Sequence, residues 1–81
     1  MRFTVVWDDA ALNDLAQVWM NSPVRADVRD AADRVDPLLA NDPDQQGEEF
    51  YGDRMVVIPP IQVVYRVEPD DRIVRVLSVS G

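Results

Sequence analysis

The sequence predicts an α+β fold in which one strand and a helical hairpin precede an antiparallel meander, in the order β-α-α-β-β-β(-β). Apolar residues and β-formers are concentrated in residues 2–7, recur at helical spacing between residues 9 and 39, and alternate with polar residues from Glu48 onward. We therefore expect an antiparallel-dominated, twisted sheet with an αα-hairpin packed on one of its faces. The 81 residues fit a single domain, residues 1–81.

The helical region is expected to contain two helices joined by a very short connection. Asp8 is a candidate N-cap for the first helix, whose apolar stripe is Leu12, Leu15, Ala16 and Trp19, and which should end near Met20-Asn21. Ser22 and Pro23 predict the N-cap and first position of the second helix. Pro37 predicts a kink or an early stop, because proline lacks the backbone donor of a helix interior.

The remaining strands are separated by turn residues. Gly52-Asp53 predicts a two-residue hairpin turn, and Pro59-Pro60 must break or bulge the sheet. Ile61, Val63, Tyr65 and Val67 are expected to share one face of the next strand. The last strand, residues 72–79, is nearly continuous in Ile and Val, which predicts a neighbour on each side. Either Val74/Val76 or Ile73/Leu77/Val79 could face the helices.

The composition excludes several kinds of chemistry. The sequence has no cysteine, histidine or lysine. Disulfides, thiolate nucleophiles and lysine nucleophiles are therefore excluded, and imidazole is available neither as a base nor as a metal ligand. We expect no cofactor and no metal. The net charge of −7 opposes direct binding to nucleic acid. Without an expected signal peptide or membrane-spanning segment, the protein is predicted to be cytoplasmic and to bind no membrane.

The order of elements resembles that of the RelE/ParE superfamily, the toxins of type II toxin–antitoxin systems. The opening segment, residues 6–16 (VWDDAALNDLA), is similar to the family's first strand and helix start. Residues 63–77 (VVYRVEPDDRIVRVL) look like the family's last two strands and their acidic turn. The resemblance covers almost the whole chain. It implies either cleavage of messenger RNA in the ribosome, as in RelE-like members, or poisoning of DNA gyrase, as in ParE-like members.

Most of the basic residues that the nuclease members carry have no counterpart in this sequence. Gln62 stands where the family commonly has arginine, and the last strand is followed only by Ser80-Gly81 instead of a histidine, arginine or tyrosine. Arg54 is the best match to a family basic position. If the protein cuts RNA, the resemblance assigns catalysis to Arg54 and Arg75 with Tyr65 or Tyr51, although the alternation of Tyr65 with Ile61, Val63 and Val67 favours a core ring.

Four residues are candidates for binding a partner: Trp19, Gln62, Arg66 and Arg72. Trp19, with Met20 and Val24, could belong to the core or to a docking groove. Arg66 and Arg75, if they are cross-strand neighbours, could bind an anion bidentately or simply pair with Glu48, Glu49 or Glu68.

The leading hypothesis is a toxin-type component of a type II toxin–antitoxin module that binds a cognate antitoxin and lacks intrinsic RNase activity. Because the chain is acidic, the antitoxin should be neutral or basic, or bind mainly by apolar contact. A further target, DNA gyrase or the ribosome, stays open. The alternatives are a ribosome-dependent mRNA endonuclease of RelE type and a non-toxic interaction module on the same scaffold.

Overall fold

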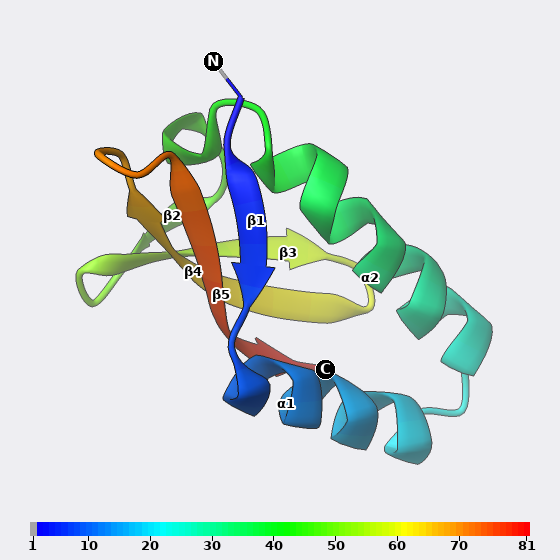
Figure 1. Cartoon of the computed structure of the whole chain (residues 1–81). Helices are drawn as coiled ribbons and strands as arrows, with labels where there is room; N and C mark the ends of the chain where they lie inside the picture. Colours follow the sequence, from blue (N-terminus) through cyan, green and yellow to red (C-terminus); the bar gives the residue numbers. More distant parts are fainter. Residues whose placement is uncertain (1) are drawn as a thin grey trace.

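A five-stranded mixed sheet carries a helical hairpin on one face (Figure 1). The computed structural model describes residues 2–81. The elements are β1 (Thr4–Trp7), α1 (Asp9–Asn21), α2 (Arg25–Leu39), the 3₁₀ turn η1 (Pro43–Gln45), β2 (Glu48–Phe50), β3 (Asp53–Ile58), β4 (Ile61–Glu68) and β5 (Ile73–Ser80). This arrangement confirms the predicted fold class and element order.

The strands lie in the order β1-β5-β4-β3-β2. The first strand, β1, runs parallel to β5, and the other neighbours are antiparallel. The prediction that the last strand has a neighbour on each side is therefore confirmed. Its sequence is apolar on both faces because β5 is central in the sheet.

The core lies between the sheet and the two helices. It contains Val28, Ala31, Val35 and Leu39 of α2 and Ala11 of α1, packed against Val56, Ile58, Ile61, Val63, Tyr65, Val74, Val76 and Val79 of the sheet. The predicted inward face of β4 is confirmed. On β5 the inward residues are Val74 and Val76 and then Val79, because Leu77 has no partner on β4 and the alternation shifts there by one residue.

The stripe predicted for α1 only partly coincides with its core face. Ala11 is buried, and Leu15 and Val18 pack against the core, whereas Leu12 and Trp19 remain 49 % and 42 % exposed. The two sets lie on adjacent sides of the helix, since α1 meets β5 with one side and α2 with the next. Of the predicted stripe, Leu15 packs against the core and the other three residues are exposed, so helical spacing alone did not identify the buried side of α1.

The predicted helix caps are wrong in detail. Asp8 precedes α1, but its side chain makes no capping hydrogen bond. The second helix begins at Arg25 instead of Pro23, because the Ser22 hydroxyl accepts a hydrogen bond from the Val24 N–H and closes a separate turn. Pro37 does not stop α2 at once, and the helix ends two residues later, at Leu39.

Of the two hairpin turns, the β3–β4 turn was predicted correctly and the β2–β3 turn was predicted one residue too late. The β2–β3 turn is Tyr51-Gly52, one residue earlier than predicted, because both residues have positive φ, 50° and 87°, while Asp53 enters the ladder. Pro59-Pro60 breaks the sheet as a two-residue turn between β3 and β4. Arg72, expected in the last strand, lies in the preceding turn with a φ of 53°.

Candidate functional site

The residues predicted for a site lie in three separate places: a clamp beneath the sheet, the sheet face that the helices leave uncovered, and a groove between the helices. Tyr65 and Arg54 form the clamp. Gln62, Arg66 and Arg75 lie on the uncovered face, Arg72 lies at its end, and Trp19 lies in the groove.

Tyr65 and Arg54 are cross-strand partners that hold the segment before β2. The Tyr65 hydroxyl lies 2.7 Å from the Pro43 carbonyl oxygen and 2.8 Å from that of Gln46, and donates its proton to this pair. The Arg54 guanidinium donates to the carbonyl oxygens of Gln46 at 2.9 Å and Gly47 at 3.1 Å. Both side chains thus bind backbone that has no ladder partner.

The Tyr65 side chain is fully buried. Desolvation by burial raises the pKa of its phenol above 10.0, and the neighbouring Arg54 partly opposes that shift. A phenol with a raised pKa, whose proton is already donated to carbonyl oxygens, is poorly placed to exchange protons with a substrate. The arrangement supports a structural role for Tyr65 and Arg54.

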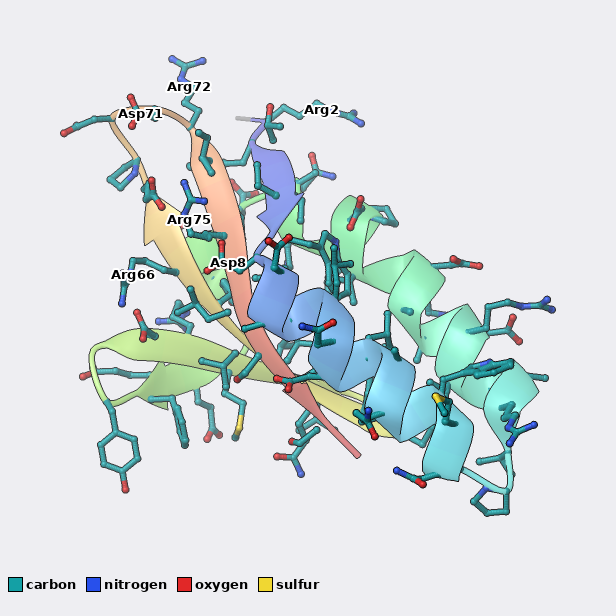
Figure 2. The ribbon with its side chains drawn as sticks, turned by 60° about the horizontal axis from the view of Figure 1, so that its bottom comes forward. Arg2, Asp8, Arg66, Asp71, Arg72 and Arg75 are labelled. Atoms are coloured by element: carbon teal, nitrogen blue, oxygen red, sulfur yellow. The ribbon has the colours of Figure 1, made fainter. Side chains whose placement is uncertain are left out.

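Arg66 and Arg75 are cross-strand neighbours on the uncovered sheet face, as the sequence suggested. Each is paired with carboxylates. Arg66 donates to Asp53 at 2.9 Å, and Arg75 donates to Glu68 at 2.8 Å and to Asp8 at 3.4 Å. In Figure 2, Arg75 lies close to Asp8, which follows β1. We call these five side chains the paired-charge face.

The ion pairs of the paired-charge face shift the pKa values of its members in the expected directions. The Asp53 carboxylate raises the pKa of Arg66, and Glu68, followed by Asp8, raises that of Arg75. The hydrogen bond from Arg75 lowers the pKa of Glu68. At neutral pH three carboxylates therefore face two guanidinium groups, and their net charge repels a phosphate.

The remaining residues of the uncovered face are exposed. Gln62 points away from the buried face of β4, and Arg72 lies in the β4–β5 turn, near Arg2 at one end of the sheet (Figure 2). Within residues 2–81, neither Arg72 nor Arg2 forms an ion pair, and no three potential metal-ligating side chains form a cluster.

A groove of about 500 Å³ runs between α1 and α2 on the side away from the sheet core. We call it the helical groove, and its lining is Leu12, Leu15, Ala16, Trp19, Met20, Val28, Arg29, Ala32 and Asp33. Leu12, Trp19 and Met20 are each more than two-fifths exposed. The alternative that Trp19 belongs to the core is therefore wrong, and large apolar side chains here face solvent.

Arg25 fixes the end of this groove and was not singled out from the sequence. Its guanidinium donates to the carbonyl oxygens of Trp19 at 3.2 Å and Met20 at 3.0 Å, which closes the C-terminus of α1. It also lies 4.9 Å from the centre of a Trp19 ring, within the range of a cation–π contact. Trp19 is thereby held in place although it is exposed.

Two partners of the arginines were also missed, and one of them left a signal in the sequence. Counting outward from the Pro59-Pro60 turn places Asp53 opposite Arg66 on the neighbouring strand, an opposite-charge pair. Asp8 reaches Arg75 only because β1 runs parallel to β5, and the spacing of residues does not predict that contact.

Comparison with solved structures identifies the fold. The sequence matches no family model and no curated protein. A chain of the RelBE2 toxin–antitoxin complex from Mycobacterium tuberculosis superimposes with a TM-score of 0.82 at 19 % identity, over 100 % of this chain and 92 % of the other. This chain has the RelE/ParE toxin fold.

Two further structures with the RelE/ParE fold support this assignment. A chain of the ParDE system from P. aeruginosa gives a TM-score of 0.76 at 21 % identity, over 98 % of this chain and 95 % of the other. RelE from E. coli in the free state, in a doubly substituted form, gives 0.67 at 17 % identity, over 100 % and 84 %. The resemblance stated from the sequence is confirmed as a RelE/ParE fold.

Among residues 2–81, no helix is long and apolar enough to cross a bilayer.

Proposed function

We propose that this protein is the toxin-type component of a type II toxin–antitoxin module, that it binds a cognate antitoxin through the helical groove, and that it has no intrinsic RNase activity. The RelE/ParE fold supports the toxin class, since RelBE2 and ParDE are toxin–antitoxin systems. The exposed apolar lining of the helical groove carries the choice of binding site.

The chemistry of the helical groove and the charge of the whole chain suggest what the antitoxin presents there. An apolar groove between two helices suits the apolar face of an amphipathic helix. The net charge of −7 and Asp33 in the lining favour basic residues beside that apolar face. The antitoxin is therefore neutral or basic, or bound mainly through Leu12, Trp19 and Met20.

The paired-charge face supports the absence of RNase activity. Stabilising the transition state of RNA cleavage needs positive charge at the phosphate. On this face the positive charges of Arg66 and Arg75 are neutralised by Asp53, Glu68 and Asp8. Gln62 adds no charge. Of the four catalytic candidates, Arg54 and Tyr65 bind backbone carbonyls, Arg75 lies on the opposite face of the sheet, and Tyr51 lies in the β2–β3 turn.

Growth and primer-extension assays test this function together. Expression of the protein alone should arrest bacterial growth, co-expression of the antitoxin from a neighbouring reading frame should relieve the arrest, and primer extension should show no new cuts in messenger RNA. Arrest would then come from another target, such as DNA gyrase.

Each other outcome selects a different function. Cuts in messenger RNA would establish a ribosome-dependent endonuclease. If the cuts disappear in Arg54→Ala, Arg54 is catalytic, and if they persist in that variant, it is not. Normal growth, with the protein folded and abundant, would favour a non-toxic interaction module.

A further inference from the structure

The tip of the β2–β3 hairpin presents two aromatic rings to solvent. Tyr51 is 93 % exposed, and Phe50 beside it is 37 % exposed. Their ring centres lie 4.8 Å apart at an interplanar angle of 81°, an edge-to-face pair. Figure 1 shows this hairpin extending from the sheet on the side away from both helices. The pair is therefore separate from the helical groove.

Tyr51 is not the residue that the turn itself prefers. Tyr51 and Gly52 both have positive φ, the geometry in which Asn, Asp or Gly is favoured at the first position. A side chain larger than these costs about 1 kcal/mol or more in that conformation. Neither the preference of the turn nor burial explains a tyrosine here, since the side chain is almost fully exposed.

The charges beside the rings indicate what could bind them. Glu48 lies on the same face of β2 as Phe50, is exposed and forms no ion pair within residues 2–81, whereas Glu49 lies on the other face, opposite Arg54. In the sheet formed within residues 2–81, β2 is an edge strand. Aromatic faces attract Arg and Lys cations, and adjacent carboxylates add to this attraction. The Arg25–Trp19 contact is an example of such a pair within the chain itself.

We propose that the hairpin tip, formed by Glu48, Phe50 and Tyr51, is a second docking point that binds an arginine- or lysine-bearing segment of a basic protein partner. The rings of Tyr51 and Phe50 take the cationic side chain, and Glu48 neutralises its charge. This goes beyond the proposed function, because it holds whether or not that partner is an antitoxin.

A peptide titration tests the docking point. The probe is a fluorescently labelled peptide of six Gly-Arg repeats, followed by anisotropy at low salt, with amide NMR shifts to locate the site. The largest shifts should fall on residues 48–53. Tyr51→Asn should weaken binding about threefold to fivefold, the factor expected of an exposed cation–π contact. Glu48→Gln should weaken it by a similar factor.

Two controls keep the result decisive. Tyr51→Asn should raise Tm by about 4 °C or more, because asparagine suits the turn, so lost binding cannot be attributed to unfolding. Val57→Ala, an exposed position near the other end of β3, should leave peptide affinity unchanged. Shifts centred on the aspartates of α2, or equal affinity of Tyr51→Asn and the unchanged protein, would overturn the proposal and leave only diffuse charge attraction. A fall in Tm would refute the argument that Tyr51 is retained against stability.

Discussion

Replacing Tyr65 by phenylalanine is expected to lower the free energy of unfolding by about 1–3 kcal/mol, the usual range when buried acceptors lose their donor. The ring would still fill its place in the core, but the carbonyl oxygens of Pro43 and Gln46 would lose the hydroxyl proton. Urea denaturation followed by tryptophan fluorescence measures the difference.

Comparison with Tyr65→Ala separates the hydroxyl from the ring. The alanine variant should lose about 3–5 kcal/mol, because a cavity is added in the core. Unchanged stability of Tyr65→Phe would contradict the structural role of the Tyr65 hydroxyl and leave a catalytic role open for it.

The raised pKa of Tyr65 adds an alkaline signature to the same prediction. Below pH 10 the phenol is neutral in both folded and unfolded chains, so its contribution to stability is complete. As the pH rises past 10, the unfolded chain ionises first and the contribution is lost up to the folded pKa. Tyr65→Phe should therefore show a smaller loss of stability above pH 10 than the unchanged protein.

Removing the carboxylates of the paired-charge face is expected to create affinity for RNA. The variant Asp8→Asn/Asp53→Asn/Glu68→Gln frees Arg66 and Arg75, and changes the net charge from −7 to −4. We expect binding of a short single-stranded RNA to tighten about tenfold or more at low salt. The slope of log K against log salt should steepen by about 0.7 for each freed arginine. Filter binding across a salt series measures both.

A variant with the same net charge is the control. Asp27→Asn/Asp30→Asn/Asp33→Asn on α2 removes three carboxylates but frees neither Arg66 nor Arg75. If both triple variants gained the same affinity, the effect would be one of total charge, and pairing on the sheet would not be what keeps RNA away.

Local sequence patterns predicted the fold well because they record which side of an element is buried. Alternation on β4 correctly placed Ile61, Val63 and Tyr65 inside, and the apolar β5 correctly indicated a central strand. The pattern could not choose the inward face of β5. Leu77 interrupts the alternation there, and an irregularity of this kind depends on pairing with β4.

The candidate site was harder to predict because it depends on contacts between distant segments. Trp19 looked the same in the sequence whether buried or exposed, and only the way α1 lies on β5 left it in the helical groove. Arg75 looked like a free cation until β1 brought Asp8 beside it. The absence of histidine and lysine, by contrast, is visible in the sequence without any knowledge of contacts between distant segments.

The most direct test is a calorimetric titration of this protein with the polypeptide encoded by the reading frame next to its gene. We predict one-to-one binding that Trp19→Glu weakens about thirtyfold or more, as for a tryptophan at the centre of an interface. Val57→Glu, at a more exposed apolar position on the uncovered sheet face, should leave the affinity unchanged. Binding that survives Trp19→Glu but is lost in Val57→Glu, or no binding at all, would contradict the helical groove as the antitoxin site.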